Sequence, residues 1–126
     1  MKSLTQHIVE KLVLNSNTKV RKFNYHPKTK DELKELIDKL IKERGNEADL
    51  NDIDVSEITD MSALFKNSDF NGDISEWNVS NVEDMNYMFH NASNFDCDIS
   101  GWDVGKVTNM SWMFCAAESF NQPLND

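Results

Sequence analysis

The chain has 126 residues, 39% of them hydrophobic and 10% aromatic, which is enough for one compact domain with a modest core. Its net charge of -9 argues against direct binding of nucleic acid, because phosphate recognition needs clustered Lys and Arg. The charge is uneven: residues 1–49 carry 11 basic and 8 acidic side chains, whereas residues 50–126 carry 2 and 14. This change predicts two parts of one compact unit, an N-terminal cap over 1–49 and a different architecture over 50–126.

The first part of the chain is predicted to form a helix, a strand and a second helix. Ser3 can cap the first helix, which an amphipathic pattern of Leu, Ile and Val supports as far as residue 14. Residues 19–25 alternate between polar and apolar side chains, as a strand does. The segment KTKDELKELIDKLIKERG predicts a second helix between an N-cap at Thr29 and a C-cap at Gly45, with one apolar stripe.

The second part of the chain contains an internal repeat. WNVSNVEDMNYMFHNASNF at 77–95 returns as WDVGKVTNMSWMFCAAESF at 102–120, so that Trp102 stands in the place of Trp77. An earlier copy, IDVSEITDMSALF, begins at residue 53, and its Met61 stands in the place of Met85. The sequence therefore predicts three copies that start near residues 53, 77 and 102.

Each position of the repeat has an expected structural role. Met, followed by Met or Leu and then Phe three and four residues later, matches one face of a short helix. The residues immediately before the first Met can cap free N–H groups; they are Asp60, Asp84 and Asn109. Ile-x-x-Trp-x-Val suits a short parallel strand. One copy cannot bury its apolar side chains alone, so stacked copies should form a continuous core, as in a solenoid.

These motifs resemble the BspA-like family of bacterial surface proteins with leucine-rich-type repeats, also found among mycoplasma lipoproteins. The pattern W-[DN]-V-x-x-V-x-[DN]-M-x-x-M-F-x-x-A-x-x-F-[ND] is complete at 77–96 and 102–121 and weaker at 53–71. The resemblance implies an α/β fold: a short leucine-rich-repeat-like solenoid behind the helix–strand–helix cap. It also implies protein binding and adhesion, with no catalytic residues.

No pattern in the sequence indicates catalysis, a cofactor or a metal site. Cys97 and Cys115 lack the spacing of a zinc site and are predicted to be free thiols in a reducing compartment. The three histidines are scattered along the chain. No segment approaches the ~20 apolar residues of a membrane span. The N-terminus lacks the apolar run of a signal peptide, so we expect a cytoplasmic protein, or a cell-surface protein if a signal has been removed.

Two surfaces are candidate partner-binding sites. The residues that flank the Met/Phe stripe vary between copies and should form an aromatic patch; they are Tyr87, His90, Trp112 and Cys115. Acidic side chains could form a second surface that attracts a basic partner; they are Glu76, Asp98 and Asp103. Structural explanations account for these residues about as well. Tyr87 and Trp112 could simply cover the edge of the predicted helix, and the acidic side chains could simply keep the protein in solution.

The end of the repeat array predicts a third surface. FNQPLND should lead into another Trp-x-Val, and the sequence stops there. We expect an incompletely covered C-terminal edge lined by Trp102, Phe114, Phe120 and Leu124. A homodimer or a protein partner could cover it.

The function expected from the sequence is that of a non-enzymatic protein-binding repeat module. One alternative is an intracellular inhibitor, phage-encoded for example, whose acidic surface blocks a basic or nucleic-acid-binding site on a host enzyme. The other is a structural fragment of a longer surface adhesin array.

Overall fold

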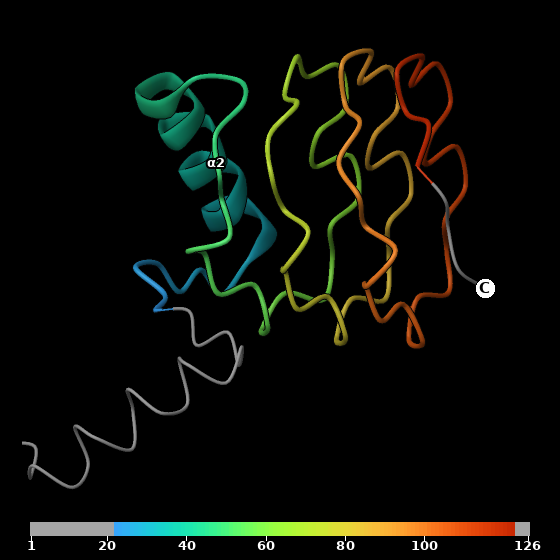
Figure 1. The fold of residues 1–126 in the computed structure, drawn as a ribbon. Coiled ribbons are helices and arrows are strands. Elements are labelled where there is room, and N and C mark those ends of the chain that lie inside the picture. Colours follow the sequence, from blue (N-terminus) through green and yellow to red (C-terminus); the bar gives the residue numbers. More distant parts are fainter. Residues whose placement is uncertain (1–21, 123–126) are drawn as a thin grey trace, which may run out of the picture.

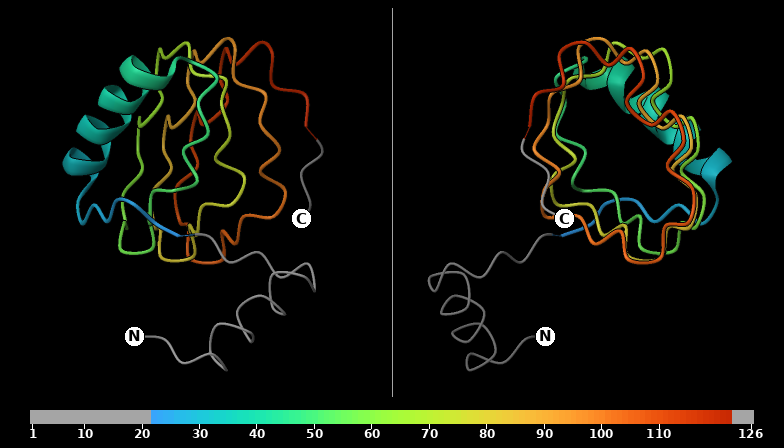
Figure 2. Two further views of the ribbon diagram at one scale, coloured as in Figure 1. Left: turned by 60° about the vertical axis from the view of Figure 1, so that its left-hand side comes forward. Right: turned by 90° about the vertical axis from the view of Figure 1, so that its right-hand side faces the viewer.

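The computed structural model describes residues 22–122, and Figure 1 shows one helix at one end of a series of similar coils. The coils lie side by side, and they superpose when the molecule is viewed along the series (Figure 2). Little of the described chain is regular secondary structure apart from this helix, α2 (Lys30–Arg44). The first predicted helix and residues 19–21 of the predicted strand lie outside the described residues.

Helix α2 forms where the sequence predicts it. The side chain of Thr29 accepts a hydrogen bond from the Glu32 N–H at 3.2 Å, which satisfies a free donor of the first turn. At the other end, Gly45 adopts a φ of 92° and its N–H donates to the carbonyl of Ile41. The apolar stripe buries Leu33, Ile37 and Leu40 against the coils. Charged side chains on the opposite face pair locally, as in the Lys34–Asp38 ion pair.

The short parallel strands predicted in each copy do not form within residues 22–122. Parallel pairing there is limited to four isolated bridges, of which Tyr25↔Ile53 is all that appears of the predicted strand that ends at residue 25. Bridges Asp60↔Asp84 and Asp84↔Asn109 join equivalent positions of successive copies. The extended pairing ends there, because the side chains of Asp60, Asp84 and Asn109 close a turn directly after each bridge.

The short helix predicted after each first Met is also wrong. The residue two positions after that Met has a positive φ in every copy: 57° at Ala63, 60° at Tyr87 and 60° at Trp112. A second positive φ follows four residues later, at Asn67, Asn91 and Ala116. A left-handed residue interrupts a right-handed helix, so the segment is a chain of turns. Asp60, Asp84 and Asn109 therefore cap no helix, and each instead closes a turn by accepting a hydrogen bond from the N–H two residues on.

A row of backbone hydrogen bonds joins each copy to the next. In the first copy the N–H groups of Met61, Ala63, Phe65 and Asn67 donate to four carbonyls of the second copy, at 2.8 to 2.9 Å. The second copy repeats the pattern toward the third: the donors are Met85, Tyr87, Phe89 and Asn91, and the acceptors are Asn109, Ser111, Met113 and Cys115. Every bond in these rows runs from the N–H of one copy to the carbonyl of the following copy. We call the four N–H groups of a copy its donor row.

Rings from equivalent positions stack along the interior of the series. Phe65, Phe89 and Phe114 follow one another with ring centroids 5.6 and 5.4 Å apart. Trp77 and Trp102 form a parallel stack with ring centroids 6.5 Å apart. The indole N–H of Trp77 donates to the carbonyl of Leu50, and that of Trp102 donates to the carbonyl of Ile74, one coil earlier in each case. Phe89 is fully buried and also stacks on Phe95 at 4.1 Å. One buried cluster extends from α2 to the third copy, so the predicted stacking of matching side chains is confirmed within residues 22–122.

Phe89→Ala should lower the free energy of unfolding by about 3 to 5 kcal/mol, because it leaves a cavity in the middle of the ring stack. Phe23→Ala is the matched control: Phe23 is 38% exposed, and its loss should cost less than about 1 kcal/mol. Urea unfolding followed by circular dichroism measures both variants. Equal losses in the two variants would contradict a stabilising stack.

Gly72→Ala should destabilise the fold by about 1 to 3 kcal/mol through overpacking. A Cβ atom at residue 72 would overlap the carbonyl oxygen of Ala48 and the ring of Phe70. Gly101→Ala is the control, since nothing lies within 4 Å of the position its Cβ would take. Thermal unfolding midpoints compare the two, and a Gly72→Ala midpoint equal to that of the control would show that the backbone there has room.

Candidate functional site

The predicted aromatic patch comes together in the structure around a stacked pair of rings. Tyr87 and Trp112 lie with centroids 6.3 Å apart and planes 13° from parallel. His90 packs against Tyr87 with centroids 5.2 Å apart. Lys66, one copy earlier, places its Nζ 5.0 Å from the centre of the Tyr87 ring in a cation–π contact. We call Lys66, Tyr87, His90 and Trp112 the ring face.

Trp112 is the most exposed large apolar side chain of the described residues. Its relative exposure is 60%, although it stacks on Tyr87. The Nδ1 atom of His90 is buried and has no hydrogen-bond partner within residues 22–122, so any polar contact of this ring with a ligand must use Nε2. Cys115 occupies the slot of His90 one copy on and is half-buried. The ring face thus joins three of the four residues predicted for this patch, and Cys115 lies in the adjoining slot.

Acidic side chains of the repeats, including the predicted surface residues Asp98 and Asp103, close turns of the backbone. In each copy, Asp or Asn side chains accept a hydrogen bond from the N–H two residues later and so close a turn. Asp98 does this with Ser100 at 2.9 Å, and Asp103 with Gly105 at 3.0 Å. The hydrogen bonds from the backbone and side chain of Ser100 lower the pKa of Asp98 below its usual value, so its carboxylate stays charged to a lower pH than a free Asp. The N–H of Glu76 donates to the side chain of Asn51.

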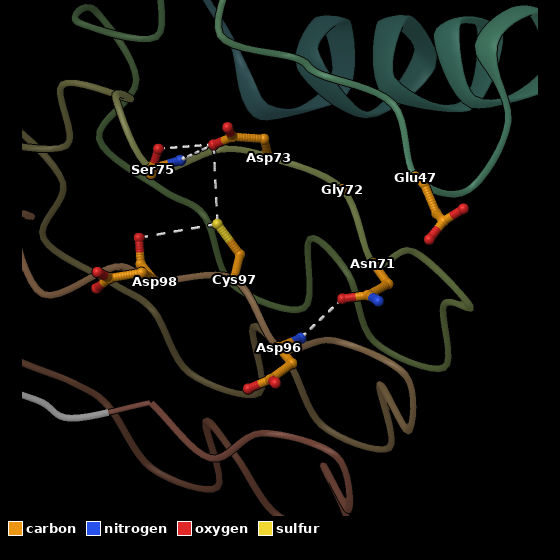
Figure 3. A pocket seen from close by; sticks show the side chains of 8 residues that line it. All are labelled: Glu47, Asn71, Gly72, Asp73, Ser75, Asp96, Cys97 and Asp98. Atoms are coloured by element: carbon orange, nitrogen blue, oxygen red, sulfur yellow. Dashed lines mark hydrogen bonds between the residues drawn. The ribbon is translucent and has the colours of Figure 1, made fainter.

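A shallow depression of about 390 Å³ lies on the coils beside the loop that follows α2. Figure 3 shows the acidic side chains around it. Asp98 is the one predicted acidic-surface residue that lines it, whereas Glu76 and Asp103 lie elsewhere. The Asp96 N–H donates to Asn71 across the depression at 3.0 Å. The remaining lining residues are Glu47, Gly72, Asp73, Ser75 and Cys97. No group of three or more His, Cys, Asp or Glu residues within 22–122 could hold a metal ion.

Both cysteines are free thiols in the structure, as predicted. Burial is the main cause that raises the pKa of the Cys97 thiol, and the nearby carboxylates of Asp73 and Asp98 raise it further. The Sγ atom lies 3.9 Å from Asp73 Oδ1. A raised pKa lowers the thiolate fraction, so this position is poorly suited to a nucleophile.

The C-terminal edge differs in part from its prediction. Phe114 and Phe120 are partly buried and stack on each other with centroids 4.4 Å apart. Trp102 is buried, with 8% exposure, because it packs on Trp77. Leu124 lies outside the described residues.

Sequence reasoning missed two residues of this edge. Val104 is 37% exposed and Met110 is 43% exposed, whereas their counterparts in the second copy, Val79 and Met85, are 1% and 0% exposed. The repeat alignment itself carried the signal, since the core positions of the last copy lack the following copy that covers them in earlier ones.

None of the helices in the part of the chain that the structure describes has the length and apolar character needed to cross a membrane.

Residues 32–126 match the model of a family described as "Mycoplasma protein of unknown function, DUF285". This match covers most of the chain, which therefore belongs to that family. No curated protein matches the chain. No solved structure matches it either.

Cys97 in the folded chain should react with iodoacetamide at pH 8 at least about threefold more slowly than the same thiol in the urea-unfolded chain, because less of it is thiolate. Asp98→Asn keeps an oxygen for the Ser100 N–H but removes one negative charge, so it should lower the Cys97 pKa and speed alkylation. Mass spectrometry of the two cysteine peptides follows each site separately. A Cys97 alkylation rate that is the same in the folded and the urea-unfolded chain would contradict the raised pKa.

Proposed function

We propose that the chain is a short solenoid of leucine-rich type, related to the BspA-like repeat proteins, and that it works as a non-enzymatic protein-binding module. Membership in the mycoplasma family supports the relationship. The donor rows, which link successive copies at equivalent residues, support the assignment as a solenoid. We propose no catalytic role for this chain, and we propose that its binding partner is a protein.

The ring face is the proposed binding surface, and the exposure of Trp112 is the observation that carries the proposal. A Trp side chain that is 60% exposed keeps a large apolar area in water. Stacking on Tyr87 holds the ring in place, so a partner that covers it loses little side-chain entropy on binding. Rigid Trp and Tyr side chains are the most frequent binding anchors at protein interfaces.

A second candidate function is inhibition of a protein with a basic surface, for which the acidic depression is the supporting observation. Glu47, Asp73, Asp96 and Asp98 line one shallow surface on a chain of net charge -9. Such a surface speeds the approach of a basic partner and makes binding dependent on salt. The turn-closing bonds of Asp73 and Asp98 also account for part of this charge, which favours the ring face as the primary site.

Trp112→Ala should weaken binding at least about tenfold for peptides selected by display on the immobilised chain, because it removes the anchor. Phe23→Ala removes another exposed ring and should leave the affinity unchanged. Fluorescence anisotropy at low and high salt gives the dissociation constants.

Binding through the ring face should change little with salt. Selected peptides that are rich in Lys and Arg, bind Trp112→Ala normally and lose affinity steeply with salt would favour the acidic surface instead.

A further inference from the structure

The donor rows give the series of coils a direction. In the first and second copies, four N–H groups of alternate residues point toward the following copy and meet its carbonyls. The third copy has the same backbone, with φ of 60° at Trp112 and 59° at Ala116. Its donor row consists of the N–H groups of Met110, Trp112, Phe114 and Ala116, and none of these four has a hydrogen-bond partner within the described chain. We call this the outer donor row.

Apolar side chains accompany the outer donor row. Val104, Met110 and Trp112 are three of the four exposed large hydrophobic side chains within residues 22–122. Unpaired N–H groups and exposed apolar side chains of the described chain therefore lie on the same edge. A ligand for this edge must supply carbonyl oxygens and apolar contacts together.

A second molecule of this chain is a poor ligand for the edge. At the opposite end of the series, α2 lies against the first copy, where Lys30 Nζ contacts Ser62 Oγ at 3.1 Å and Asp60 at 3.6 Å (Figure 1). The carbonyl side of that copy is therefore covered by the helix. Two third copies face to face would set one donor row against another, which leaves every N–H unpaired.

An extended β-strand is also a poor match. The edge of a strand presents N–H and C=O groups in alternation. Half of the groups facing the outer donor row would therefore be N–H donors, which cannot bond to other donors. A coil with the backbone of these repeats presents carbonyls alone at four alternate residues, as Asp84, Asn86, Met88 and His90 do toward the first copy.

We propose that the edge formed by Val104 and the Met110–Ala116 segment docks a coil of the same repeat conformation whose carbonyl side is uncovered. The coil accepts the four hydrogen bonds of the outer donor row and covers Val104, Met110 and Phe114 with its own Val, Met and Phe. The edge and the ring face share Trp112, but the inference rests on the outer donor row and on Val104 and Met110, so it does not depend on the function proposed above.

The test uses amide hydrogen exchange on the full chain, with a peptide of sequence 77–101 as the probe. Without peptide, the amides of the outer donor row should exchange at least about tenfold faster than those of Met85, Tyr87, Phe89 and Asn91. Saturating peptide should slow exchange of the outer donor row at least about tenfold. A row that is already protected in a dimer of the free chain would overturn the proposal.

Two variant peptides test the conformation of the docked coil. Tyr87→Ala removes the ring but retains a residue that can take a positive φ, as Ala63 does in the first copy, so this peptide should still protect the row. Tyr87→Pro fixes φ near -65° and should not protect it. Equal protection by both peptides would overturn the proposal, because it would show that the backbone conformation is irrelevant.

A tethered copy removes the entropic cost of folding a free peptide. The chain is lengthened after Asp126 by a second copy of residues 102–126, with a scrambled sequence of the same composition as the control. The outer donor row should become protected at least about tenfold in the first protein and stay unprotected in the second. A row that still exchanges freely beside the tethered repeat would overturn the proposal, whatever the free peptide does.

Discussion

Contact between matching side chains of successive copies is the interaction on which the rest of the structure depends. The backbone hydrogen bonds within a copy are turn bonds between residues three apart, such as Met88 N–H to the Met85 carbonyl, and they bury no apolar area on their own. The stack of Phe65, Phe89 and Phe114 supplies the buried apolar area, and the donor rows fix the register to a single residue. Helix α2 closes one end of this stack with Leu33, Ile37 and Leu40, and the third copy leaves the other end of the described chain with unpaired groups.

The surfaces available for binding follow from this arrangement. Positions inside the stack stay apolar in every copy, whereas exposed slots such as those of Tyr87 and Trp112, which form the ring face, can vary in chemical type. The acidic side chains are constrained as well, because Asp60, Asp84 and Asp98 close turns through their carboxylates. Much of the negative charge therefore comes from side chains that the turns of the backbone require. The aromatic slots are better able to distinguish one partner from another.

The sequence predicts the parts of the fold that depend on side-chain spacing. Helix α2 follows from its apolar stripe, its Thr29 cap and Gly45, and the burial of the Met, Phe and Trp positions in the first two copies follows from the repeat. The backbone of the repeats was not predictable in the same way. Apolar residues at positions i, i+3 and i+4 fit a helix, but a chain of turns with left-handed residues places them on one side too. Left-handed residues are usually Gly or Asn, and here Ala63, Tyr87 and Trp112 hold that conformation because the stacking of the copies imposes it.

The uniform sense of the donor rows has a consequence for assembly. The four N–H groups of each donor row point along one axis, so the two ends of the series are chemically unlike along these rows. If the docking proposed above occurs, new layers join at the donor end, because α2 covers the other end. A polymer built on this rule grows from a single tip and has a defined start. The length of such a polymer then depends on how many uncapped layers are supplied.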